Sequence, residues 1–206
     1  MSKIKICGIR REQDIDYVNE CKPDYIGFIF FPKSKRYIEP EKALQLRKKL
    51  DPSISPVGVF VNEQIDTIVK IVEAGIVDVV QIHGDEPVEY LKELKKRLPE
   101  VTIVRAVRVA SKEDVASCEE IPADYLLFDK FTPEYGGCGE AFDWELVKGM
   151  KRPFILAGGI KEENVEEAIQ RLSPYAVDVS SAVEGEDGYK DYHKVVRLVR
   201  KVKGIK

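Results

Sequence analysis

Short apolar runs rich in β-branched residues alternate with amphipathic charged segments along the whole chain, an order that few architectures accept. Strict alternation of this kind is typical of a parallel sheet with right-handed crossovers. The apolar runs predict strands at Lys3–Cys7, Tyr25–Phe30, Ser55–Val61, Val77–Ile82, Thr102–Val107, Tyr125–Phe128, Pro153–Ala157 and Tyr175–Val179. Apolar residues at the helical period predict helices at Pro40–Leu50, Glu63–Ala74, Pro87–Leu98, Glu163–Leu172 and Tyr192–Val202, and less regular spacing predicts two more at Arg11–Glu20 and Asp143–Met150.

The alternation amounts to eight strand-then-helix units. Dividing 206 residues among them gives about 26 residues each, which fits a closed (β/α)8 TIM barrel of the α/β class. A doubly wound open sheet is the alternative that the pattern alone leaves open. Because no linker, low-complexity stretch or change in composition marks a boundary, residues 1–206 are expected to form a single barrel domain.

Composition excludes several classes of protein. With 44% hydrophobic residues the chain can bury enough surface to fold, whereas its longest apolar run, Tyr25 to Phe31, is far shorter than the roughly 20 residues of a membrane span. The net charge is −3 with both signs scattered, and the basic cluster Arg197 to Lys206 is interpreted as the solvated face of a terminal helix. We therefore expect neither a membrane nor a nucleic-acid partner. Met1 to Arg10 alternates Lys with Ile and lacks the apolar core of a secretory signal, so the expected compartment is the cytoplasm.

The residues that most often bind metals are few and scattered. None of the cysteines forms a C-x-x-C pair, and the chain has two histidines. Neither a zinc site nor a disulfide framework is predicted, and no metal or other cofactor is expected. The residues concerned are Cys7, Cys21, Cys118, Cys138, His83 and His193.

Polar or reactive side chains end five of the eight predicted strands. In a barrel these ends meet at one rim, where the active sites of such enzymes are built. A few polar loop residues would be unremarkable, but five strand ends are more than chance supplies. They are Cys7-Gly8, His83-Gly84-Asp85, Asp129, Ala157-Gly158-Gly159 and Asp178, the last followed by Ser180-Ser181.

Strand alternation predicts which of these side chains point inward. If Ile4 and Ile6 face the helices, then Lys3, Lys5 and Cys7 point into the barrel. A buried Lys5 ammonium requires a carboxylate partner, and its charge would favour the thiolate of Cys7. The alternative for Cys7 is a small buried hydrophobe without a chemical role.

The same alternation places Asp129 on the inner face with Leu127, and His83 on the inner face with Gln81. Cys21 and Cys118 fall in helical stretches and are interpreted as structural.

The last two units indicate a phosphate site. Gly158 and Gly159 follow the seventh strand, ahead of a helix expected to begin near Lys161, and Ser180 and Ser181 follow the eighth. Glycines permit close approach of the backbone, and the N–H groups of a helix N-terminus complement a phosphate dianion. Loops at these two positions form the usual phosphate site of a barrel.

Two further loops carry candidate residues. Gly136-Gly137-Cys138-Gly139 lies in a segment from Lys130 to about Ala141, whose length suits a mobile lid beside Asp129 as well as a plain flexible loop. Arg36, in the loop after the second strand, has the forked donor geometry that holds a carboxylate, although a solvated basic loop is an equal interpretation.

Taken together, these motifs resemble the phosphoribosylanthranilate isomerase family. The matches follow the family order over nearly the entire chain. They are Lys5-Ile6-Cys7-Gly8-Ile9, Gly27-Phe28, Ser34-Lys35-Arg36-Tyr37, Gly58-Val59-Phe60-Val61-Asn62, Val80-Gln81-Ile82-His83-Gly84-Asp85-Glu86, Asp129 with Gly136-Gly137-Cys138-Gly139, Leu156-Ala157-Gly158-Gly159-Ile160 and Asp178-Val179-Ser180-Ser181.

The resemblance implies a (β/α)8 barrel that carries out an Amadori rearrangement in tryptophan biosynthesis without a cofactor. N-(5-phosphoribosyl)anthranilate would become the 1-deoxyribulose 5-phosphate derivative. We expect Asp129 to be the general acid and Cys7, with a pKa low enough to supply thiolate, the general base. The family pattern further implies that Arg36 holds the anthranilate carboxylate, that Gly158, Gly159, Ser180 and Ser181 hold the phosphate, and that Asp178 and His83 contact the substrate.

This sequence departs from the family pattern at Arg10, often Thr, at Cys138, usually Thr or Ser, and at Ala182, usually Gly. The alternatives are another phosphosugar barrel enzyme, such as indole-glycerol-phosphate synthase with a catalytic Lys and Glu, and a non-catalytic barrel that binds a phosphate ligand. The partner is expected to be a small phosphoribosyl substrate, and the chain a monomer or a homodimer.

Overall fold

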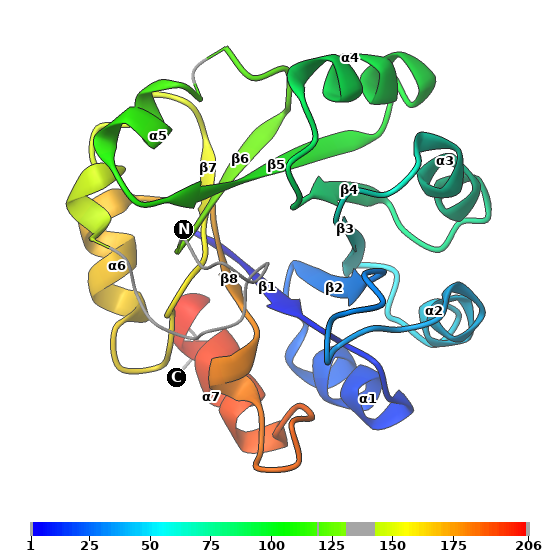
Figure 1. The fold of residues 1–206 in the computed structure, drawn as a ribbon. Coiled ribbons are helices and arrows are strands. Elements are labelled where there is room, and N and C mark those ends of the chain that lie inside the picture. The colour runs from blue at the N-terminus through cyan, green and yellow to red at the C-terminus, as the bar shows by residue number, and fades with distance from the viewer. Residues whose placement is uncertain (1, 119, 131–142, 205–206) are drawn as a thin grey trace.

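The structure, a computed structural model, describes residues 2–118, 120–130 and 143–204. Its strands close into one parallel barrel in which each strand pairs with its neighbours in the sequence and β8 pairs with β1. This confirms the TIM barrel and excludes the open sheet. Figure 1 shows the ring of strands enclosed by the helices. The strands are β1 (Lys3–Cys7), β2 (Tyr25–Ile29), β3 (Ser55–Phe60), β4 (Val79–Ile82), β5 (Thr102–Val109), β6 (Tyr125–Lys130), β7 (Phe154–Leu156) and β8 (Ala176–Val179).

Most helices lie where apolar spacing predicts them. The differences fall after β5 and β6, where α5 was not predicted and the expected helix over Asp143–Met150 is a single 3-10 turn, η1. The predicted lid from Lys130 to Ala141, with Cys138, lies outside the described residues except for Lys130 itself. The helices are α1 (Glu12–Cys21), α2 (Pro40–Arg47), α3 (Ile65–Glu73), α4 (Val88–Arg97), α5 (Lys112–Ala116), η1 (Trp144–Leu146), α6 (Val165–Leu172), η2 (Ser181–Val183) and α7 (Tyr192–Val202).

Two apolar cores hold the barrel together. The larger lies between the sheet and the helices and contains Ile4 and Ile6, as strand alternation predicts. The smaller fills the barrel itself with inward residues of β3 to β8, mostly valine and alanine. Leu127 belongs to this inner core and Phe128 to the outer one, which confirms the predicted direction of β6.

A layer of tyrosines lies at the amino end of the barrel. The hydroxyls of Tyr25 and Tyr175 lie 2.9 Å apart, and the ring of Tyr125 stacks on that of Tyr175. Lys3 points inward, as predicted, and its ammonium donates to Tyr175 at 2.8 Å and to Tyr25 at 3.3 Å. The hydrogen bond to Tyr175 is the main reason that the pKa of Lys3 is raised, so the lysine stays charged. Between this layer and Lys5 lies a cavity of about 80 Å³.

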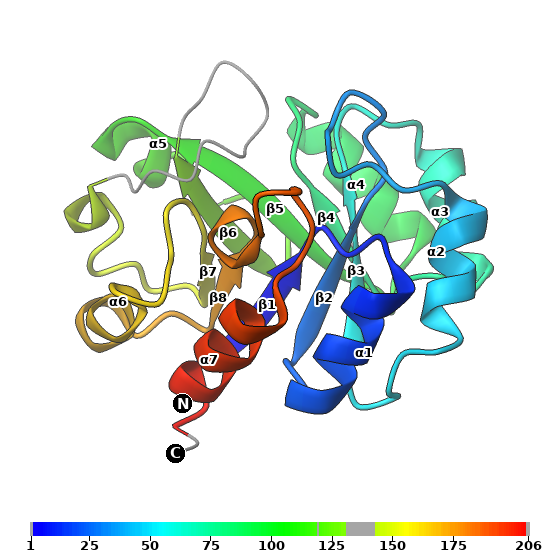
Figure 2. The ribbon, with the colours of Figure 1, turned by 90° about the horizontal axis from the view of Figure 1, so that it is seen from below.

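The two helices at the ends of the chain pack side by side on the outside of the barrel. Figure 2 shows α1 beside α7, and the rings of Tyr17 and Tyr192 meet edge to face at 5.3 Å. The inner side of α7 is buried, whereas Arg197 is largely exposed and pairs with Glu162, which agrees with a solvated basic face. Within the described parts of the chain, no helix is both long and apolar enough to cross a membrane.

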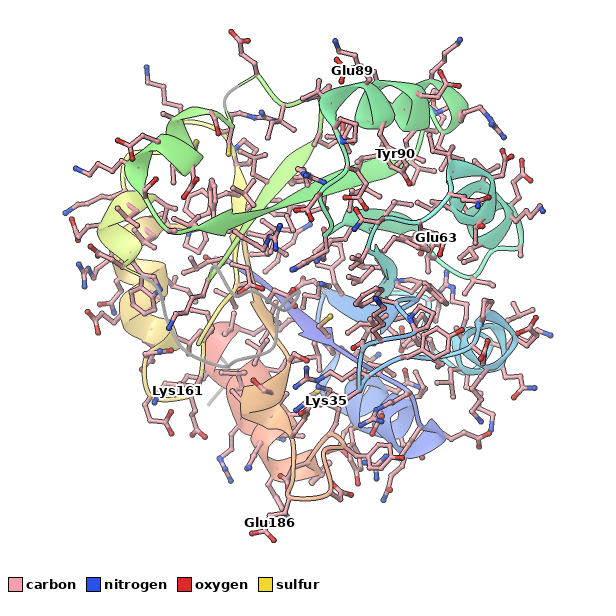
Figure 3. The ribbon with its side chains drawn as sticks, in the orientation of Figure 1. Lys35, Glu63, Glu89, Tyr90, Lys161 and Glu186 are labelled. Atoms are coloured by element: carbon pink, nitrogen blue, oxygen red, sulfur yellow. The ribbon has the colours of Figure 1, made fainter. Side chains whose placement is uncertain are left out.

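Charged and hydroxyl groups also join the loops that follow the strands. The buried carboxylate of Glu86 accepts the backbone N–H of Asn62 at 2.6 Å and the guanidinium of Arg105 at 2.8 Å. Figure 3 shows Tyr90 on α4 pointing toward Glu63, and the Tyr90 hydroxyl donates to the Glu63 carbonyl at 2.7 Å. These contacts hold the loops after β3 and β4 together at the rim.

Candidate active site

The structure brings the two proposed proton-transfer groups to one rim. Cys7 ends β1 and Asp129 lies near the end of β6, so in a parallel barrel both stand at the carboxyl-end opening. The carboxylate of Asp129 lies 3.6 Å from the imidazole of His83, which follows β4. Cys7 is buried, and the Lys5 ammonium lies beside its thiol.

Lys5 has the carboxylate partner that its burial requires. Its ammonium lies 2.8 Å from Asp178 on β8 and 2.7 Å from the amide oxygen of Gln81 on β4. Burial alone would lower the pKa of Lys5, but Asp178 and Cys7 together raise it, so the ammonium is charged. The inward-facing residues of three strands are thereby joined beneath the opening.

Burial has the largest effect on the pKa of the Cys7 thiol. It raises the thiol pKa, and the nearby cations Lys5, Lys190 and Arg36 offset only part of that effect. The expectation of a low thiol pKa is therefore wrong, because the desolvation of a buried thiolate outweighs the attraction of its neighbours. The charge of Lys5 nevertheless lowers the thiol pKa of Cys7, as predicted.

Replacement of Lys5 by methionine is expected to raise the pKa of Cys7 further. The change removes the cation that most favours the thiolate and leaves the negative charge of Asp178 uncompensated. The pKa is measured from the ultraviolet absorbance of the thiolate, as the difference between each protein and its own Cys7→Ser partner. Lys3→Met is the matched control, because Lys3 contacts the tyrosine layer instead. An unchanged pKa in Lys5→Met would show that Lys5 does not tune the thiol.

Two glycines leave room for the proposed acid and base. A Cβ on Gly27, which pairs with Cys7 across β1 and β2, would lie 2.6 Å from the Cys7 sulfur. A Cβ on Gly158 would lie 2.8 Å from a carboxylate oxygen of Asp129, and its φ of +69° also favours glycine. Glycine at these two positions therefore lets the neighbouring backbone lie close to the Cys7 thiol and the Asp129 carboxylate.

Arg36 is held in a buried ion cluster rather than left free. Its Nε and one Nη donate to the two oxygens of Glu184 at 2.5 and 2.9 Å. Lys190 donates to the same carboxylate at 3.1 Å and to the Ser180 carbonyl at 3.0 Å. Despite the desolvation of Glu184, hydrogen bonding to Arg36 and attraction by Lys190 lower its pKa. One edge of the guanidinium is thus paired with Glu184.

Replacement of Glu184 by alanine is expected to lower the free energy of unfolding by about 3–5 kcal/mol, because it leaves the buried charges of Arg36 and Lys190 unpaired. Urea unfolding at pH 7 measures the loss. Glu167→Ala removes a partner of Arg171 from an exposed pair and should leave the unfolding free energy near that of the unmodified chain. Equal stabilities of the two variants would contradict the role given to the cluster.

The predicted phosphate loops lie after β7 and β8 as expected. Gly158 and Gly159 both have positive φ, which places consecutive backbone groups in a tight turn. The Ser180 hydroxyl donates to the Cys7 carbonyl at 3.1 Å, and Ser181 begins η2. The following helix, α6, begins at Val165 and not near Lys161, because a turn capped by Asn164 comes first.

The two carboxylate oxygens of Asp178 differ in their contacts. Oδ2 pairs with Lys5, whereas Oδ1 is buried and has no hydrogen-bond partner among the described residues. An unpaired buried acceptor is costly, so a donor from a ligand would satisfy it. The expected contact of Asp178 with the substrate stays a prediction, for which Oδ1 is the available acceptor.

Three contributors to the site were not predicted: Gln81 as a bridge, Glu184 and Lys190. The inward direction of Gln81 follows from the alternation in β4. Asp187-Gly188 is a turn signal, and Glu184 and Lys190 do pair as an antiparallel bridge across this turn. That signal could have placed the two charges side by side, but it does not indicate their contact with Arg36.

Two of the three departures from the family pattern, Arg10 and Ala182, lie in the described part of the chain, and Cys138 lies outside it. Arg10 packs on the ring of Tyr189 at 4.1 Å and donates to the Gly188 carbonyl at 2.6 Å, which secures the turn before Lys190. Ala182 lies in η2 and does not adopt a positive φ. Across residues 2–118, 120–130 and 143–204, no three His, Cys, Asp or Glu side chains are grouped so as to hold a metal ion.

Comparison with known proteins gives one consistent result. The family model described as N-(5′-phosphoribosyl)anthranilate (PRA) isomerase matches residues 4–201. The N-(5′-phosphoribosyl)anthranilate isomerase of Thermoanaerobacter sp. (strain X514) is 50% identical over 209 residues, covering 100% of both chains.

Two solved structures are also similar. A phosphoribosyl anthranilate isomerase in complex with reduced 1-(o-carboxyphenylamino)-1-deoxyribulose 5-phosphate is 35% identical, with a TM-score of 0.87 over 99% of this chain and 100% of that one. A structure of monomers of the dimeric isomerase from Thermotoga maritima is 37% identical, with a TM-score of 0.84 and the same coverage. The barrel, the rim residues and these matches together place the chain in the N-(5′-phosphoribosyl)anthranilate isomerase family.

Proposed function

We infer that this chain is an isomerase of tryptophan biosynthesis that converts N-(5′-phosphoribosyl)anthranilate to 1-(2-carboxyphenylamino)-1-deoxyribulose 5-phosphate. The observation that carries the proposed mechanism is the placement of Cys7 and Asp129 at one opening, each beside a glycine that leaves it space. An acid and a base that flank one pocket are what an Amadori rearrangement requires.

Asp129 acts first as the general acid. Its proton passes to the ring oxygen of the ribose as the C1–O bond breaks, and the lone pair of the anthranilate nitrogen forms the C1=N bond. One Asp129 oxygen accepts the Lys130 backbone N–H at 2.8 Å, and the other faces the imidazole of His83. The second oxygen is therefore the one that delivers the proton.

Cys7 then acts as the general base. Its thiolate takes the proton from C2, the electron pair of that C–H bond forms a C1=C2 double bond, and the π pair of the C1=N bond returns to the nitrogen. The product is an enolamine, which tautomerises to the ketone. The buried groups around Cys7 comprise three cations, Lys5, Arg36 and Lys190, against the two carboxylates Asp178 and Glu184. The three cations lower the free energy of the thiolate and so offset part of the cost of its burial during the proton transfer.

The remaining site residues bind and orient the substrate. Arg36, which Glu184 orients, holds the anthranilate carboxylate, and the Oδ1 atom of Asp178 accepts a hydrogen bond from a sugar hydroxyl. The backbone after β7 and the loop at Ser180 and Ser181 hold the phosphate. His83 lies against Asp129 at the same opening.

The function is tested by following anthranilate fluorescence while the purified chain is incubated with freshly formed phosphoribosylanthranilate. Conversion to the ribulose derivative supports the isomerase, whereas binding without conversion would identify a phosphate-ligand sensor. Rescue of a tryptophan auxotroph that lacks this isomerase provides the same test in cells. Failure of both would contradict the proposal.

The proposed chemistry uses residues of one chain, so it applies to a monomer and to a homodimer alike. The cytoplasm is the proposed compartment, because Cys7, Cys21 and Cys118 are free thiols, as is usual in reducing surroundings.

A further inference from the structure

We propose that His83 is a positioning residue that holds Asp129 through its Nε2–H, and that Lys5 and Gln81 fix it in the neutral tautomer which carries that proton. The proposal rests on the proposed role of Asp129 as general acid. It is carried by an unbroken series of contacts from β1 to β6 across the top of the barrel.

The first contact orients the amide of Gln81. An ammonium group is a donor without acceptor capacity, and the Lys5 Nζ lies 2.7 Å from the amide oxygen of Gln81. That oxygen must therefore face Lys5, because the reverse orientation would place two donors against each other. The amide nitrogen of Gln81 is then directed away from Lys5.

The second contact determines the tautomer of His83. The Gln81 Nε2 lies 2.9 Å from the His83 Nδ1, and an amide nitrogen can only donate. Nδ1 must therefore accept this hydrogen bond and carry no proton. A neutral imidazole then has its single proton on Nε2, and an imidazolium would place two N–H groups in opposition.

The third contact aims that proton at the general acid. The His83 Nε2 is buried, has no hydrogen-bond partner among the described residues and lies 3.6 Å from the Asp129 Oδ2. Both side chains are largely shielded, with 11% and 15% of their surface exposed. The distance between Nε2 and Oδ2 is slightly too long for a hydrogen bond, so the His83 N–H faces the carboxylate without a hydrogen bond to it.

The consequence is stabilisation that grows during the reaction. When Asp129 gives its proton to the sugar, the new carboxylate attracts the His83 N–H more strongly than the neutral acid did. An interaction that strengthens in the transition state raises kcat rather than substrate affinity.

The tautomer can be read directly by ¹⁵N NMR of histidine-labelled protein. His83 and His193 are the two histidines of the sequence, and a His193→Gln variant leaves His83 as the single signal. That variant should keep normal activity, because His193 is exposed on α7 with its ring against Tyr192 and contacts none of the proposed site residues. We expect the Nε2–H tautomer at neutral pH.

In Gln81→Glu, whose carboxylate accepts at Nδ1, the proton should move to Nδ1 or the ring should become charged. An Nδ1–H tautomer or an imidazolium in the unmodified Gln81 background would overturn the proposal.

The kinetic test separates positioning from a structural or substrate-binding role. His83→Leu removes the donor and should lower kcat about ten- to hundredfold with KM nearly unchanged, whereas His83→Gln, whose amide N–H reaches a similar place, should recover part of the loss. A rise in KM in both variants, or equal kcat values for both, would contradict the proposal. The NMR result does not depend on turnover, so an inactive parent chain would refute the proposed function without deciding the tautomer.

Discussion

Replacement of Cys7 by serine is expected to lower kcat about 10²- to 10⁴-fold while KM changes little. A serine hydroxyl in this buried position does not ionise in the neutral range, so the C2 proton loses its acceptor. Serine is also slightly smaller than cysteine, so it fits beside Gly27, which leaves space for a sulfur atom. Steady-state kinetics monitored by anthranilate fluorescence give both constants.

The matched control is Cys118→Ser. Cys118 is likewise buried, but its thiol donates to the Asp114 carbonyl at 2.8 Å on the outside of the barrel. Turnover of Cys118→Ser should equal that of the unmodified chain. If Cys7→Ser retained comparable turnover, the general base would have to be another group.

Asp129→Asn is expected to cause a loss of similar size, about 10²- to 10⁴-fold in kcat, for the complementary reason. An amide keeps the shape of the carboxyl and can still meet the Lys130 N–H, but it has no acidic proton for the ring oxygen. The step that fails is ring opening, so a substrate whose ring is already open should react normally with Asp129→Asn. The two variants can therefore be told apart by the intermediate at which each stops.

Asp124→Asn provides the control for Asp129→Asn, because Asp124 precedes the same strand at the opposite end of the barrel. Its carboxylate accepts the Ile103 N–H and pairs with Lys95. Its replacement should leave kcat unchanged. Normal turnover in Asp129→Asn would remove Asp129 from the mechanism, whatever Cys7→Ser shows.

The strands and the rim were predictable because burial alternates along short parallel strands. The β1 pattern was sufficient to place Lys5 and Cys7 inside the barrel, and the structure agrees. Helix α5 was missed because Lys112–Ala116 is too short for its apolar spacing to register; its one local signal is the capping box of Ser111 and Asp114.

The parts of the site that sequence reasoning missed depend on contacts between distant loops. Arg36 and Glu184 are 148 positions apart, and no local pattern links them. The acidity of Cys7 was misjudged for a related reason. The cation beside it could be predicted from strand parity, whereas the cost of complete burial becomes clear when the surrounding loops are in place.

The tyrosine layer around Lys3 has a consequence for the order of events in each turnover. The packed inner core lies between these tyrosines and the rim, so a ligand bound at Cys7 and Asp129 can arrive and leave only through the opening at the carboxyl end. The product must leave through the opening by which the next substrate enters, so product and substrate compete for the same binding site. The ribulose derivative should accordingly act as a competitive inhibitor, and at high flux its departure can limit throughput more than bond-making does.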